Sequence, residues 1–290
     1  MAPVKQLVAL RRKAGLTKEE YCDYHYQKHG AVSTAPTATE TPRKYFQTHF
    51  IDAAYHADPT QHVPNAHPPW AFSDGVTELY FDSPEHLKHV FQSEWVAQKV
   101  GPDGANFSDF SAVLPMFVRE DTVPLSIASA SASETHQPKG NAFVAMYFVA
   151  LHSPGKASET VISELVSCID CHASQDVLTM LVNTPDDTDF DLGSYFGGEP
   201  PVSFQFIFTM TLRGKESISA IRKAQEDFEE RVQSLDLPAT WIGFGERAVV
   251  LDQTENIKVS RTLVLCHPTE LQLITKLKFD ARRQPFKRSI

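Results

Sequence analysis

The feature that most constrains the fold is an order of predicted elements that occurs twice. Residues 121–140, rich in Ser, Ala and Pro, have the composition of a linker. On each side, runs of apolar and aromatic residues typical of strands alternate with amphipathic runs typical of helices. Both sides give strand, helix, strand, strand, helix, strand, which is the ferredoxin-like βαββαβ unit.

The element bounds follow from these patterns. In the first half we expect strands at 3–12, 43–52, 75–82 and 112–119, and helices at 17–29 and 84–98. In the second half we expect strands at 141–151, 176–183, 202–213 and 240–250, and helices at 157–172 and 215–234.

The predicted fold class is α+β, with two ferredoxin-like units in tandem. Such a unit carries its helices on one face of an antiparallel sheet, so the other face must be covered. We predict that the two sheets cover each other as an intrachain α+β barrel. The predicted parts are a domain at 1–120, the linker, a second domain at 141–252, and a C-terminal extension at 253–290 with a strand candidate at 259–266.

Composition narrows the functional classes. The 290 residues are 42% hydrophobic and carry a formal charge of −9, which argues against a nucleic-acid partner. No apolar run is long enough for a membrane span, and the N-terminus lacks the pattern of a secretion signal. Four cysteines in a chain of this length do not form a disulfide framework. We therefore expect a cytoplasmic protein without a membrane partner.

An unusual stripe marks the first predicted helix. Thr17 and Glu20 form a capping-box pattern at its start. Tyr21, His25 and His29 then follow at a spacing of four, so they lie on roughly one face. Imidazoles and a phenol are poor choices for packing, but they can move protons near neutral pH.

The first half resembles the EthD domain of the dimeric α+β barrel superfamily over about residues 3–120. The segments that carry the resemblance are RRKAGLTKEEY at 11–21, the helix end Lys28-His29-Gly30, and DGVTELYFDSPE at 74–85. The second half lacks these signatures and resembles the fold by element order alone, as a degenerate copy would.

The resemblance implies a pocket between the sheet and the helices. It implies a small hydrophobic or aromatic metabolite as the partner, often of secondary metabolism, and it leaves a homodimer open. The reactions proposed for relatives are decarboxylation, dehydration or cyclisation without a cofactor. Other members of the wider superfamily bind haem, so the resemblance constrains the fold more than the chemistry.

His29 matches the family position and is our first catalytic candidate, since a neutral imidazole in a pocket can take up and return a proton. The alternative is a structural histidine that caps the helix end. Tyr45, Gln47 and His49 alternate along a strand with Phe46, Thr48 and Phe50. If the apolar set faces the helices, the polar set faces the barrel interior, which makes Tyr45 and His49 further catalytic candidates.

The substrate-binding candidates are Tyr21 and His25 on the helix, Trp70 and Phe72 in the long loop 53–73, and Asp74 after it. A loop packed by its own aromatics is the alternative. Asn106 and Asp109 are weaker candidates.

Three motifs are discounted. A metal at His25 and His29 lacks a third ligand. The CxxCH motif at 168–172 lies within a predicted helix, where cysteines pack as small hydrophobes. The acidic run at 187–191 lacks the glycine and the final glutamate of an EF-hand loop.

The sequence therefore predicts a cofactor-independent lyase or cyclase that acts on an aromatic or polyketide-like substrate by histidine acid/base catalysis. Two alternatives stay open: a haem-dependent oxygenase or peroxidase on the same fold, and a non-catalytic barrel that binds a small molecule.

Overall fold

The protein is described from a computed structural model, which covers residues 3–34, 37–126, 141–153, 158–186, 188–197 and 200–258. The predicted strand at 259–266 and most of the predicted linker lie outside these residues. Among the described residues, no helix combines the length and the apolar character needed to span a bilayer.

The first half contains four strands: β1 (Val4–Leu10), β2 (Lys44–Tyr55), β3 (Gly75–Phe81) and β4 (Leu114–Val123). Its helical segments are α1 (Lys18–Asp23), η1 (Tyr24–His29), α2 (Gly30–Val32), η2 (Ala38–Glu40), α3 (Pro84–Phe91), η3 (Val96–Val100), α4 (Gly101–Asp103), η4 (Gly104–Asn106) and η5 (Phe110–Ala112). Strand β4 continues three residues into the segment predicted as linker.

The second half contains β5 (Ala142–Val149), β6 (Val177–Pro185), β7 (Phe206–Leu212), β8 (Trp241–Asp252) and the short β9 (Ile257–Lys258). Its helical segments are α5 (Ser158–His172), α6 (Leu192–Phe196), η7 (Lys215–Ser217), α7 (Ile218–Arg231) and η8 (Leu237–Ala239). The βαββαβ order is confirmed in both halves, and α6 is an addition that the sequence patterns do not predict.

The two sheets join into one closed antiparallel barrel. The strand order is β2-β3-β1-β4 in the first half and β6-β7-β5-β8 in the second, the same order in each unit. Strand β4 pairs with β6, and β8 pairs with β2, so the ring closes within a single chain. The predicted intrachain α+β barrel is confirmed. It differs in one respect from two stacked sheets, because the sheets also join at their edges.

Two glycines allow the strands beside His49 to approach closely. A Cβ at Gly245 on β8 would lie 2.2 Å from the carbonyl oxygen of His49, and one at Gly75 on β3 would lie 2.4 Å from that of Thr48. A side chain at either position would push β2 away from its neighbour. The seam between β2 and β8 also contains two register shifts, which bend β2 around the barrel.

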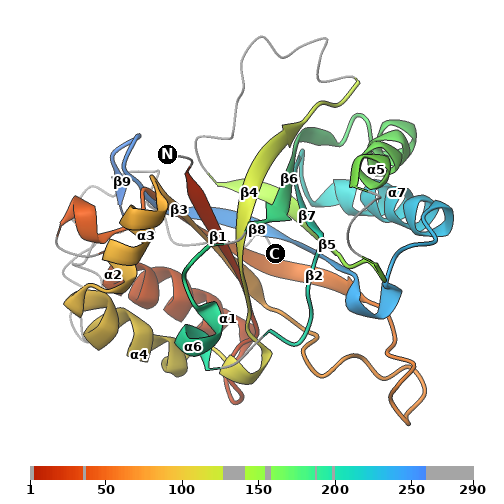
Figure 1. Ribbon diagram of the computed structural model, residues 1–290. Helices are drawn as coiled ribbons and strands as arrows, with labels where there is room; N and C mark the ends of the chain where they lie inside the picture. Colours follow the sequence, from red (N-terminus) through yellow and green to blue (C-terminus); the bar gives the residue numbers. More distant parts are fainter. Residues whose placement is uncertain are drawn as a thin grey trace, which may run out of the picture.

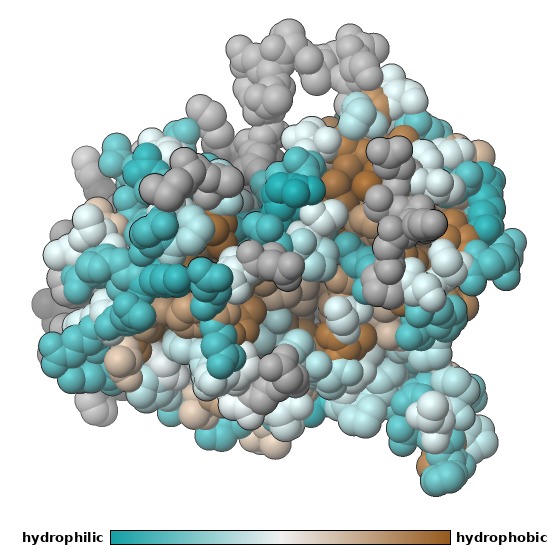
Figure 2. Space-filling model, in the orientation of Figure 1, coloured by the Kyte–Doolittle hydropathy of each residue, from teal (hydrophilic) through white to brown (hydrophobic). Residues whose placement is uncertain are grey.

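The helices cover the outside of the barrel in two groups (Figure 1). Helices α5 and α7 pack on the second sheet around a continuous apolar core that includes Leu165, Ile221 and Phe228. Helices α1 to α4 cover the first sheet, and α6 from the second half lies among them. Figure 2 shows hydrophobic residues exposed between polar rims on that side.

The barrel interior is apolar at its centre and charged toward one end. Strands of both halves contribute apolar side chains such as Leu7, Phe148 and Trp241, and the last two rings stack at 4.1 Å. Near this core, the Lys5 ammonium lies 2.9 Å from Glu78, and the Arg247 guanidinium lies 3.1 Å from the same carboxylate. All three side chains are buried.

Candidate active site

A capped helix positions the family histidine. The Thr17 hydroxyl accepts the backbone N–H of Glu20 at 3.2 Å, and the Glu20 carboxylate accepts the backbone N–H of Thr17 at 2.7 Å. The predicted capping box is confirmed. It fixes the start of a helix that runs from Lys18 through Val32 without a break.

The central part of this helix is wound as a π-helix. The N–H of Gly30 bonds to the carbonyl of His25, five residues earlier, over the segment Tyr24–His29. The ring centroids of Tyr21 and His25 lie 5.5 Å apart, and those of His25 and His29 lie 5.9 Å apart. The predicted stripe therefore forms one continuous row. Single π-helical turns are frequent at functional sites, where they re-aim a side chain.

A half-buried carboxylate holds the His29 ring. Asp103 Oδ2 lies 2.8 Å from His29 Nδ1, while Asp103 Oδ1 accepts hydrogen bonds from Tyr24 and Asn106. Burial by itself would raise the pKa of Asp103, but the hydrogen bonds from His29 and Tyr24 hold it below its ordinary value. Burial and the same carboxylate raise the pKa of Tyr24 to about 12, so its phenol stays a donor.

This arrangement fixes the tautomer of a neutral His29. An ionised carboxylate only accepts hydrogen bonds, so Nδ1 carries the proton and Nε2 keeps its lone pair. A carboxylate behind a histidine also stabilises the imidazolium that forms when Nε2 takes up a proton.

His29 lies in the wall of a cavity of about 260 Å³ between the first sheet and its helices. Most of its lining is apolar, from Val8 and Leu79 on the strands to Val96 and Val100 on η3. Helix α6 of the second half adds Tyr195 and Phe196. The few polar side chains that line the cavity are those of Gln6, His29, Ser33, Tyr45, Thr77, Ser108 and Tyr195. An apolar cavity with few polar groups is typical of a small-molecule site.

Tyr45 faces this cavity from β2. Its hydroxyl accepts a hydrogen bond from the Gln47 side chain at 2.5 Å, and Gln47 in turn is anchored to the carbonyl of His25. Burial raises the pKa of Tyr45 above its ordinary value, although the hydrogen bond from Gln47 opposes this rise. The phenol therefore stays protonated and can donate to an oxygen in the cavity.

The expected orientation of β2 is wrong. Phe50 packs inside the barrel with Trp241, and the Arg247 guanidinium stacks on the Phe46 ring there. Tyr45 and His49 face the helices instead. Both faces of β2 are buried, so its alternation did not reveal which one was inside. The interior takes the apolar set because the helix side can satisfy the polar set with hydrogen bonds.

His25 and His49 lie behind the cavity, fully buried. His25 Nδ1 lies 3.1 Å from His49 Nε2, and His25 Nε2 lies 3.0 Å from the Thr77 hydroxyl. Burial, then the neighbouring His49 and His29, lower the pKa of His25, so its ring stays neutral. Phe107 stacks on His25 at 5.0 Å and also contacts His29 at 4.7 Å.

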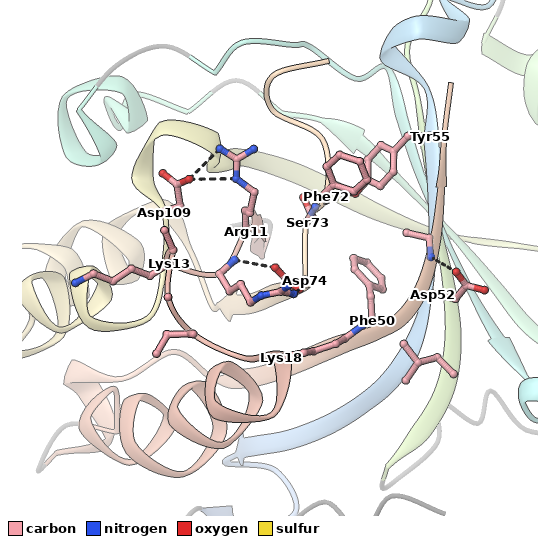
Figure 3. Close-up of a pocket in the computed structure, with 16 residues that line it drawn as sticks. Arg11, Lys13, Lys18, Phe50, Asp52, Tyr55, Phe72, Ser73, Asp74 and Asp109 are labelled. Atoms are coloured by element: carbon pink, nitrogen blue, oxygen red, sulfur yellow. Dashed lines mark hydrogen bonds and ion pairs between the residues drawn. The ribbon is translucent and has the colours of Figure 1, made fainter. Parts of the chain in front are cut away.

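The structure separates three other candidates from this cavity. Trp70 packs in the barrel core against Phe204, and neither Phe72 nor Asp74 lines the His29 cavity. Phe72 and Asp74 instead line an open pocket of about 590 Å³ at one end of the barrel (Figure 3). There Asp74 pairs with Arg12, and Asp109 pairs with Arg11 at 2.9 Å. These arginines of the family motif hold loops together.

Tyr21 is placed under the cavity, not in its wall. The side chain is fully buried, packs on His25, and contacts Phe107 at 6.0 Å between ring centroids. It supports the row of rings but does not line the site.

Sequence reasoning missed Asp103, Thr77 and the aromatics of α6. Asp103 is separated from His29 by 74 residues, and no motif links the two. The one available signal was Gly101-Pro102-Asp103, because a proline at the first helical turn followed by an acidic residue is typical of a helix start.

Residues of the discounted motifs have other partners in the described part of the chain. In the described part of the chain, no three His, Cys, Asp or Glu side chains are placed to hold a metal ion. Cys168 is buried on α5, and burial with the nearby Asp227 raises the pKa of its thiol to about 11. His172 bonds to Asp227 at 3.0 Å, and Asp191 caps α6 by accepting from Ser194.

The fold and cavity define an α+β barrel with a histidine–aspartate pair in an apolar site. Residues 13–111 match the family model of the EthD domain. A sequence search of curated proteins found no significant match.

Three solved structures are similar to this chain. An anthrone oxidase-like protein is 10% identical, with 89% of this chain and 96% of that chain covered and a TM-score of 0.52. A protein from Lactobacillus acidophilus NCFM, provisionally named a monooxygenase, is 10% identical over 87% and 97% of the chains, with a TM-score of 0.43. A variant of chlorite dismutase from Candidatus Nitrospira defluvii is 8% identical over 84% and 90%, with a TM-score of 0.39. At such identity the first of these shows the shared fold alone.

Proposed function

We propose that this protein is an enzyme that moves protons on a hydrophobic aromatic metabolite bound in the His29 cavity. The observation that carries the proposal is the pairing of His29 with the half-buried Asp103 at the wall of an apolar cavity.

In the proposed mechanism, His29 Nε2 removes a proton from a phenol or an activated C–H of the substrate. Asp103 stabilises the resulting imidazolium, which then returns the proton at another atom. Tyr45 donates a hydrogen bond to the substrate oxygen on which negative charge develops. Decarboxylation, dehydration and cyclisation of a polyketide-like ring all need this pair of groups.

The lining supports a flat, fused aromatic substrate. Rings of Phe107, Phe110, Tyr195 and Phe196 surround the cavity and offer stacking surfaces. The name of the anthrone oxidase-like structure points to a substrate of the same chemical kind.

Haem does not fit this cavity. A volume of about 260 Å³ lies below the usual range for drug-sized ligands, and a tetrapyrrole is larger still. The Phe107 ring also packs against His29, with ring centroids 4.7 Å apart, and takes up space beside it. A Soret band after haem addition, lost in His29→Ala, would instead support the haem-dependent alternative.

Anthrone provides a direct test, since its C10 hydrogens are acidic and exchange with deuterium oxide can be followed by NMR. The wild-type protein should accelerate this exchange, and His29→Ala should lower the acceleration by at least about 100-fold with the fold retained. His86→Gln, a histidine outside the cavity that bonds to the Thr41 carbonyl, is the matched control. Equal acceleration by folded His29→Ala would refute the assignment. Binding without exchange in both proteins would favour the non-catalytic barrel.

A further inference from the structure

A chain of hydrogen-bonded side chains runs behind the cavity and is not used by the mechanism above. It begins at Thr77, whose side chain lines the cavity. The Thr77 hydroxyl bonds to His25 Nε2, and His25 Nδ1 bonds to His49 Nε2. His25 therefore uses both of its ring nitrogens in this line of hydrogen bonds, and His49 uses Nε2.

The far end of this chain of hydrogen bonds, at His49, borders a second cavity. His49 forms part of the wall of a recess of about 120 Å³ on the outside of the barrel, together with Lys18, Glu19, Cys22, Asp23, Phe50, Ile51 and Glu246. Glu19, Asp23 and Ile51 in this wall are exposed to solvent. The recess and the His29 cavity have no lining residue in common among the described residues, so the three side chains connect two separate spaces.

We propose that Thr77, His25 and His49 form a proton relay between the His29 cavity and the solvent-facing recess. The inference rests on the proposed function for its purpose, because a reaction that takes or returns a net proton at the inner wall of an apolar cavity is served by a path of polar groups to water. Decarboxylation consumes a proton from solution, for example, when the carbanion is protonated.

The relay moves one net proton from the recess to the cavity. A proton from the recess binds His49 Nδ1, and the proton on His49 Nε2 moves to His25 Nδ1. The proton on His25 Nε2 moves to the Thr77 oxygen, and the Thr77 hydroxyl proton passes to an acceptor in the cavity. Each imidazole ends neutral in its other tautomer, and the reverse transfer or a ring rotation resets the chain.

The surroundings favour this concerted shift over charging of a ring. His25 is fully buried and packs against Phe107 and Tyr21, and this removal from water disfavours an imidazolium. The groups that face His25 and His49 from packed elements include the titratable side chains Tyr21, Cys22 and His29 of the helix and Glu246 of β8. The charges cluster at the recess end, where a proton would enter from water.

The test uses the full chain labelled with ¹⁵N-histidine and needs no substrate. In the wild-type protein, the NMR spectrum should show coupled His25 and His49 rings, with the His25 ring N–H exchanging with water. His49→Gln keeps a hydrogen-bonding side chain that cannot change tautomer, and it should slow this exchange at least tenfold. His86→Gln should leave the rate unchanged. Equal exchange in wild type and His49→Gln would overturn the relay, whatever the activity of the protein.

A second variant covers the case in which glutamine disturbs the packing. His49→Ala opens the recess toward His25, so added imidazole should restore fast exchange of the His25 ring proton. The same imidazole should restore anthrone exchange in His49→Ala but not in His29→Ala if the relay serves the site. A folded His49→Ala protein that exchanges as fast as wild type without imidazole would refute the relay. If His29→Ala did not slow anthrone exchange, while exchange of the His25 ring proton still depended on His49, only the proposed function would be refuted.

Discussion

The carboxylate of Asp103 lies 2.8 Å from Nδ1 of His29 and joins two segments that are 74 residues apart. Asp103 lies in α4, the short helix that follows η3. The segment η3 is a second π-helical segment, in which the N–H of Gly101 bonds to the carbonyl of Val96. His29 is the last residue of one π-helical segment, and Asp103 lies in the short helix that follows the other.

Asp103→Asn should lower the rate of anthrone exchange by about 100-fold or more, the lower part of the range for loss of a general base. An asparagine amide would donate to Nδ1 and so move the ring proton to Nε2, the atom that must accept. The rate of exchange at pH 7 is the measurement.

Tyr24→Phe is the control for this substitution. It removes one hydrogen bond from Asp103 but leaves the contact with His29, so a decrease below about tenfold is expected. If Tyr24→Phe and Asp103→Asn were equally harmful, the carboxylate would act through packing and not through the tautomer of His29.

Much of this fold could be predicted from sequence, because local patterns of residues indicate most of its strands and helices. The aromatic run Ala142–Val149 and the capping box at Thr17 are examples, and both elements are where the sequence places them. The face of β2 could not be predicted, since both of its faces are buried and each carries polar groups. Asp103 could not be predicted as the partner of His29 either, because no local sequence pattern connects positions so far apart.

Double substitution of Tyr195 and Phe196 by alanine should weaken substrate binding more than turnover. These rings form one wall of the cavity but hold no reacting proton, and each loses apolar contact area worth about 1–3 kcal/mol. We expect KM for the aromatic probe to rise at least tenfold while kcat changes little. Leu178→Ala, at an exposed position on β6, should leave both constants unchanged. A fall in kcat with constant KM would place these rings among the groups that act on the transition state.

Glu78→Gln should destabilise the barrel by about 3–5 kcal/mol, the cost of removing one partner from a buried ion pair. It leaves the ammonium of Lys5 and the guanidinium of Arg247 with less negative charge inside the barrel. Burial alone would raise the pKa of Glu78, but Arg247 and Lys5 hold it below its ordinary value. Its contribution is therefore complete above about pH 4.3, the value for an unfolded glutamate, and is lost as the pH falls through the lower folded value.

Urea unfolding at pH 7 and across the acid range measures both effects. The loss of stability below about pH 4 should be steeper in the wild-type protein than in Glu78→Gln. Arg119→Gln, which breaks an ion pair between exposed residues on β4, should cost less than about 1 kcal/mol. Identical acid profiles for wild type and Glu78→Gln would show that this carboxylate does not hold its charge in the folded barrel.

The family match ends at residue 111, yet the cavity is walled by Tyr195 and Phe196. A fragment cut at the domain boundary would keep His29 and Asp103 but lose one side of their chamber, as well as the strands that close the ring. The second half, although it lacks the histidine motif, thus cannot drift freely in sequence. If His29 and Asp103 carry out the proposed chemistry, substitutions around α6 would change which molecules enter the cavity, so specificity and reactivity would evolve on separate halves of one chain.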